Sequence, residues 1–197
     1  MDNDLQLLTN PSKIYSRSQL LKDRKLLPES PGIYAWFFKE IPPKVPTTGC
    51  VVKDGLVLLY VGISPSNPGA SKVSSKRDLK KRIMEHYSGN AEASTLRLTL
   101  GCLLSDGLNI ELRRVGSGRR MTFTKAGETK LSDWMSHNAY VTWVEHPTPW
   151  QVEEEAIKRF VLPLNLQENE SNDFSGTLSG IRSEMRSKAR NMPIILY

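Results

Sequence analysis

The sequence predicts an α+β fold, in which a small mixed or antiparallel β-sheet is flanked by helices. Two kinds of segment support this prediction. Short apolar runs rich in aromatic and β-branched residues, such as 32-GIYAWFF-38 and 139-AYVTWVEH-146, are typical of buried strands. Segments with apolar residues three and four positions apart, preceded by Ser or Thr, are typical of capped helices.

An arm of residues 1–30 precedes the first predicted strand. Within it, 18-SQLLKDRKLLP-28 has the pattern of a short helix with a Ser cap, which its final proline ends. The buried strand over 32–38 follows directly.

The next segment predicts an extended hairpin. The stretch 39-KEIPPKVPTTGC-50 holds three prolines and is expected to be a loop. The stretch 51-VVKDGLVLLYVGI-63 returns as strand, with Asp54-Gly55 as a turn signal inside it. Residues 32–63 are therefore expected to form an antiparallel pair with a long connection.

The second half of the chain is mostly helical. The run 94–104 has both helical and alternating spacing, and we favour a helix because Ser94 can cap it. Ser75 with Asp78, and Thr148 with Gln151, fit capping boxes. The expected elements are helices over 76–87, 94–104, 127–138, 149–161 and a basic helix over 181–190, strands over 109–115 and 139–146, and a loop over 116–127.

Length, charge and cysteine content bound the function. The chain has 197 residues, enough for one domain with extensions, and a net charge of +6. Basic charge favours polyanionic partners such as nucleic acid, although many proteins without such partners are mildly basic. No apolar run approaches the roughly 18 residues of a membrane span, and the N-terminus lacks a signal-peptide pattern. Two cysteines without a Cys-x-x-Cys spacing argue against structural zinc and a disulfide framework, so we expect a cytoplasmic protein.

One carboxylate lies in an unusual position on the predicted helix over 149–161. At about 100° per residue, Glu153 falls near the middle of the apolar arc, whereas Glu155 points to the opposite side. A carboxylate there is costly unless it is paired, hydrogen-bonded or bound to a metal. Glu153 is therefore either a metal ligand or the partner of an internal arginine.

Arg82 and His86 are four residues apart on the predicted helix over 76–87, so they share one side at the rim of its apolar stripe. A guanidinium and an imidazole there suit a phosphate and a proton. A solvated basic face explains the pair better when it is taken alone. Tyr34 and Tyr60 would, by themselves, be core aromatics.

Taken in order, these residues resemble the GIY-YIG nuclease superfamily. The first motif is 32-GIY-34 and the second is 60-YVG-62; Arg82 and His86 match the family's Arg-x-x-x-His. Glu153 and Asn165, in 153-EEEAIKRFVLPLN-165, match its glutamate and asparagine. The resemblance implies a bacterial, restriction-endonuclease-like or stand-alone member with an extended hairpin. It also implies three regions: an arm (1–30), a nuclease core (31–169), and a C-terminal tail with a basic helix (170–197).

The resemblance implies a metal-dependent DNA endonuclease that hydrolyses phosphodiester bonds with one divalent metal. Glu153 would be the only protein ligand of Mg²⁺ or Mn²⁺, and Arg82 would clamp the scissile phosphate. Tyr34 would activate water with His86 accepting its proton, and Tyr60 would be the alternative base or would position the nucleophile.

The remaining candidates are expected to position the site or the DNA. Asn165 would orient a site residue or a phosphate by hydrogen bonds. Cations on two helices are candidates for backbone contacts, although a solvated face is as good an explanation; they are Lys80, Lys81, Arg182 and Arg186, with Lys188 and Arg190.

Two other classes remain open: a nucleic-acid-binding module on the same scaffold that no longer cleaves, and a basic protein-interaction domain. A homodimer is expected if both DNA strands are cut.

Overall fold

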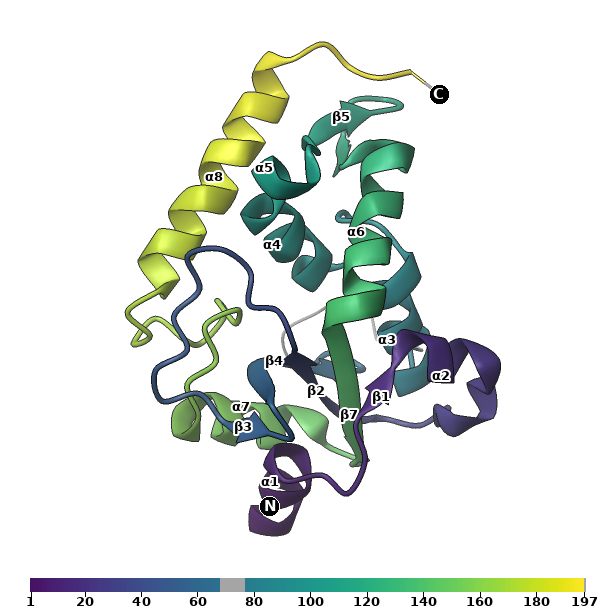
Figure 1. Cartoon of the computed structure of the whole chain (residues 1–197), viewed down its shortest axis with the longest axis vertical. Coiled ribbons are helices and arrows are strands. Elements are labelled where there is room, and N and C mark those ends of the chain that lie inside the picture. Colours follow the sequence, from purple (N-terminus) through teal and green to yellow (C-terminus); the bar gives the residue numbers. More distant parts are fainter. Residues whose placement is uncertain (68–76, 197) are drawn as a thin grey trace.

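The structure is a computed structural model that describes residues 1–67 and 77–196. Its centre is a five-stranded antiparallel sheet with the strand order β1-β7-β2-β4-β3 (Figure 1). The strands are β1 (Tyr15–Ser16), β2 (Gly32–Phe38), β3 (Val52–Lys53), β4 (Leu56–Ser64) and β7 (Ala139–Glu145). The α+β prediction, including the extended hairpin from β2 to β4, is confirmed.

The central strand β2 is buried on both faces because its side chains alternate between two cores. Tyr34, Trp36 and Phe38 enter the larger core, whereas Ile33 and Phe37 enter the smaller one. The helices of the larger core are α3 (Leu79–Ser88), α4 (Thr95–Leu103), α6 (Thr124–Asn138) and α8 (Ser175–Asn191). The smaller core is covered by α1 (Asp2–Thr9) and α7 (Pro149–Arg159).

The arm 1–30 holds more structure than the sequence indicates. Helix α1 packs on the sheet, and β1 pairs with β7 as an edge strand. The predicted helix over 18–28 is instead α2 (Arg17–Lys22), followed by a 3₁₀ turn, η1 (Arg24–Leu26). Its start was predicted wrongly because Ser16 forms the capping box, with Gln19.

The hairpin turn at Asp54-Gly55 is confirmed, with φ of 51° and 76° at these two residues. The prediction of a loop over 116–127 is wrong. This segment contains β6 (Arg120–Thr122), which pairs with β5 (Arg113–Val115), and the start of α6. Gly116 and Gly118, both with positive φ, make the tight connection that the sequence prediction missed.

The helix caps differ from the predictions in two places. Asp78 itself caps α3, because its carboxylate accepts the amide of Lys81 at 2.7 Å; Ser75 lies outside the described residues. The hydroxyl of Thr148 donates to the Gln151 side chain at 2.8 Å, so the second capping box does not form. Ser94 caps α4 as predicted. A short helix, α5 (Ser105–Leu108), follows α4.

Within the described part of the chain, no helix combines the length and hydropathy that crossing a membrane requires.

Candidate active site

Tyr34 and Tyr60 lie on the same face of the sheet. In the pairing of β2 with β4, Tyr34 is opposite Gly62 and Trp36 is opposite Tyr60, so the two tyrosines are diagonal neighbours. The register shifts between Trp36 and Phe37, one residue before Tyr60 on β4. Such bulges often re-aim a side chain beside an active site.

The glycines of the two motifs make room for this arrangement. A Cβ added to Gly62 would lie 2.5 Å from the Tyr34 hydroxyl, so the ring of Tyr34 lies across the glycine. A Cβ added to Gly32 would lie 2.4 Å from the carbonyl oxygen of Val144 and 2.5 Å from the side chain of Leu79. The first glycine therefore allows β2, β7 and α3 to pack closely.

His86 lies behind Tyr34, fully buried. Its Nε2 is 2.8 Å from the Tyr34 hydroxyl, and its Nδ1 is 2.6 Å from the hydroxyl of Ser94. Burial, with the charge of Arg82 as a second cause, holds the pKa of His86 well below its ordinary value. The imidazole is therefore neutral, and the solvated face that we considered for it is wrong.

Arg82 is held beside Tyr34. Its Nη1 donates to Glu85 at 2.7 Å and to the carbonyl of Ala93 at 2.8 Å, while its Nε is 3.4 Å from the Tyr34 hydroxyl. Its side chain is only 17% exposed, so it does not belong to a solvated face either. Among the described residues, its Nη2 has no hydrogen-bond partner.

Both tyrosines are neutral phenols in the free protein. Burial raises the pKa of Tyr34 far above its ordinary value, and burial also raises the pKa of Tyr60. Tyr60 keeps its hydroxyl 3.5 Å from that of Thr95, at the start of α4.

Glu153 faces these groups from α7. It is half-buried, and within residues 1–67 and 77–196 it makes no ion pair or hydrogen bond, so the internal arginine partner that we considered is absent from this part of the chain. Burial, and then repulsion by Glu168, raises the pKa of Glu153 to about 7, although Arg82 acts in the opposite direction.

One cavity of about 800 Å³ collects these side chains. Tyr34, Tyr60, Arg82 and Glu153 all line it, and they come from β2, β4, α3 and α7 respectively. Residues far apart in the sequence thus meet around one space, with His86 directly behind it.

A family model described as the GIY-YIG catalytic domain matches residues 32–186, from the start of β2 into α8. The chain belongs to the GIY-YIG family. The resemblance drawn from the sequence is therefore confirmed, and the chain is a member of a nuclease superfamily. No curated protein and no solved structure matches the chain.

In this GIY-YIG domain, the side chain of Asn165 contacts the backbone of the second motif. Its Oδ1 accepts the amide of Val61 and its Nδ2 donates to the carbonyl of Val61, both at 2.9 Å. Val61 lies between Tyr60 and Gly62, and Asn165 is buried. The Asn165 side chain therefore fixes the position of β4 at the second motif.

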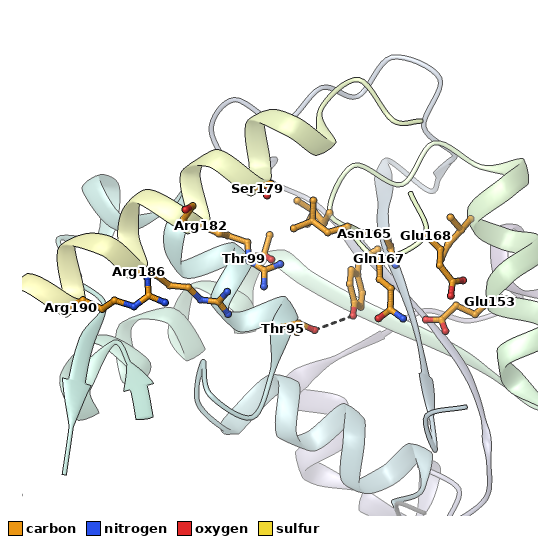
Figure 2. A pocket seen from close by; sticks show the side chains of 15 residues that line it. Thr95, Thr99, Glu153, Asn165, Gln167, Glu168, Ser179, Arg182, Arg186 and Arg190 are labelled. Carbon is orange, nitrogen blue, oxygen red and sulfur yellow. Dashed lines mark hydrogen bonds between the residues drawn. The ribbon is translucent and has the colours of Figure 1, made fainter. Parts of the chain in front are cut away.

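The four cations expected to contact DNA lie in two different settings. Lys80 pairs with Glu29 at 2.6 Å, and Lys81 pairs with Asp78 at 2.9 Å. Arg182 and Arg186, on α8, instead line a second cavity that adjoins the first (Figure 2). Lys80 and Lys81 remain predicted contacts.

The carboxylates of this GIY-YIG site fit a divalent cation. Glu153 and Glu168 line both cavities, and their repulsion is one cause of the raised pKa of Glu153, which a cation would relieve. Among the described residues, no three His, Cys, Asp or Glu side chains form a ready-made cage. A site with few protein ligands suits Mg²⁺, which keeps several of its waters, better than it suits Ca²⁺.

Sequence reasoning missed two residues of the GIY-YIG site. Ser94 was recognised only as a helix cap, and its contact with His86 depends on how α3 and α4 pack. Glu168 follows Asn165 by three residues, in a loop with no periodic signal. Its φ of 58° is rare for a residue with a side chain, and such conformations gather at functional sites.

Proposed function

We propose that the chain is a metal-dependent DNA endonuclease that hydrolyses phosphodiester bonds with one divalent metal, Mg²⁺ or Mn²⁺. The observation that supports this most is the meeting of two phenols, a guanidinium and an unpaired carboxylate around one cavity of about 800 Å³. A phosphodiester is anionic, so its hydrolysis requires positive charge, an oriented water and an acceptor for the proton of that water.

Arg82 supplies fixed positive charge. Glu85 and Ala93 hold its Nη1, so the guanidinium has little freedom left, and its Nη2 is available for a phosphate oxygen. A planar, preorganised guanidinium stabilises the charge that develops on the phosphate during attack.

Tyr34 is the proposed base, with His86 as the acceptor of its proton. The neutral His86 can take the Tyr34 proton at Nε2 if its Nδ1 carries the hydrogen donated to Ser94. The Tyr34 oxygen takes a proton from the attacking water as its own proton passes to His86, so no free phenolate has to form. Tyr60 is the alternative base, or positions that water from the other side of the cavity.

Glu153 is the proposed metal ligand, and Glu168 is close enough to raise its pKa. A divalent cation, when bound there, supplies positive charge at the phosphate and lowers the pKa of bound water. Asn165 acts through the backbone of Val61 as a positioning residue. A cytoplasmic location, and a homodimer if both strands are cut, belong to this proposal.

Nicking of supercoiled plasmid tests the activity. We expect wild-type protein with Mg²⁺ to cut, and we expect EDTA or Glu153→Ala to abolish cutting. DNA binding without cutting, unchanged by Glu153→Ala, would contradict the enzyme and favour the inactive binding module.

Removing one hydroxyl at a time distinguishes the roles of the two tyrosines. Tyr34→Phe is expected to lower the cleavage rate by at least about 10²-fold while leaving the affinity for DNA unchanged. Tyr60→Phe is expected to lose less rate. Full activity of Tyr34→Phe in single-turnover cleavage would exclude Tyr34 as the base.

A further inference from the structure

A second cavity of about 540 Å³ continues the first one towards α8. Tyr60, Thr95, Glu153 and Glu168 line both cavities, so the two spaces meet at the Tyr60–Thr95 contact. Helices α4 and α8 pack against each other beside it. Whatever lies at Arg82 in the first cavity can therefore extend into the second.

Three arginines of α8 line this second cavity. Arg182, Arg186 and Arg190 are four residues apart, so they form one row along the helix, and Figure 2 shows the row leading towards Thr95. We call these three residues the arginine row. Figure 2 shows the carboxylates of Glu153 and Glu168 at the opposite end of this cavity, and both residues also line the first cavity.

The arginine row lacks acidic partners within the part of the chain that the structure describes. None of its members makes an ion pair or a hydrogen bond there, whereas Lys188 on the same helix pairs with Glu184 at 2.8 Å. Burial, and then the charge of Arg186, lowers the pKa of Arg182. Arg186 and Arg190 are exposed, so water screens their charges, but three protonated guanidiniums without acidic partners on one side of a cavity attract an anion.

We propose that the arginine row is a binding track for consecutive phosphates of the DNA strand that is cut, on the far side of Tyr60 from Arg82. This inference rests on the proposed function and deepens it. At about 1.5 Å per residue the row spans about 12 Å of helix axis, which covers several phosphates at about 3.4 Å of axial rise per nucleotide. The strand runs from Arg82, past Tyr60 and Thr95, and along α8.

The salt dependence of binding tests the track without cleavage. The affinity for a short fluorescein-labelled DNA duplex is measured by fluorescence anisotropy in EDTA, between about 50 and 200 mM salt. Arg186→Gln and Arg190→Gln are each expected to weaken binding and to reduce the slope of log affinity against log salt by about one unit.

Arg24→Gln is the matched control, because Arg24 is exposed on η1 and Figure 1 shows α2 and α8 on opposite sides of the molecule. It removes the same charge and should leave the slope nearly unchanged. Slopes for both α8 variants that equal those of the wild type and of Arg24→Gln would overturn the proposal.

Neutral methylphosphonates, placed one at a time along the cut strand, identify which phosphates the row contacts. We expect a few consecutive positions on one side of the scissile bond to weaken wild-type binding, and one of these effects to vanish in Arg186→Gln. Effects that persist unchanged in the variants would place the phosphates elsewhere and overturn the track.

These readouts separate the two proposals. Binding does not require cleavage, so an inactive protein with a slope that depends on the arginine row would refute the nuclease activity alone. A protein that cuts plasmid while the α8 variants bind as wild type would refute the track alone.

Discussion

The hydroxyl of Tyr34 occupies space that only a glycine at position 62 leaves open. The distance of 2.5 Å to an added Cβ means that any larger residue there must displace the phenol, because β2 and β4 are fixed in register. The second glycine of the family motif is thus explained by the position of the first tyrosine.

Gly62→Ala is therefore expected to lower cleavage by about 10²-fold, because a shift of about 1 Å at a reacting group has an effect of that size. Single-turnover cleavage rates measure the effect. The control is Gly176→Ala, on α8, where an added Cβ meets nothing within 4 Å. A Gly62→Ala enzyme with the wild-type rate would show that Tyr34 does not need its present position.

At this scale, the sequence predicted the identities of the site residues better than their surroundings. Tyr34, Tyr60, Arg82 and Glu153 do line one cavity. The half-burial of Glu153, rather than full burial, results from the cavity itself, which a helical wheel does not contain. The unpaired state of the arginine row depends on where acidic residues of other elements lie, and no local pattern records that.

Among the elements, α4 is tied to its neighbours by a fully buried arginine. Arg97 donates from Nη2 to Glu128 on α6 at 2.6 Å, and from Nη1 to the carbonyls of His86 and Tyr87 on α3. Arg97 thus joins α4 to α6 through the ion pair and to α3, with its catalytic candidates, through the two carbonyl hydrogen bonds.

Arg97→Met is expected to lower the free energy of unfolding by about 3–5 kcal/mol, because it leaves the Glu128 carboxylate buried without a counter-charge. Urea unfolding measures the change. Lys188→Met, which breaks an exposed pair, is the control and should have no measurable effect. Equal stabilities for Arg97→Met and wild type would show that the buried pair does not hold these helices.

Elements with strong periodicity or caps were predicted, whereas the short strands β1 and β6 were not. The long strands β2, β4 and β7 have clear local signals, and α4, whose apolar spacing is ambiguous, has Ser94 as its cap. The two-residue strand β1 exists because it pairs with β7, and β6 because it pairs with β5 across a glycine turn. Such elements are made by tertiary contacts, which single-sequence patterns do not contain.

For the molecule as a whole, Glu153 links stability to pH. Its pKa is about 7 in the folded protein, against an ordinary value of 4.5, so the folded state holds the proton more tightly. Its contribution to stability is therefore present below about pH 4.5 and is lost as the pH rises through about 7.

Glu153→Gln is expected to be more stable than wild type at about pH 8, by on the order of 2 kcal/mol without metal, and to lose this advantage at about pH 5. Thermal unfolding at both pH values measures the difference, with the exposed Glu154→Gln as control. Mg²⁺ should raise the melting temperature of wild type but not of Glu153→Gln. A Mg²⁺ effect that survives in Glu153→Gln would show that the cation binds elsewhere.

The strands at the two borders of the main sheet, β1 and β3, are each two residues long. Each of these border strands offers little main chain of its own for another chain to extend the sheet, which is how many β-proteins associate or aggregate. If two copies act together on a duplex, we therefore expect them to meet through helices or loops rather than through β1 or β3.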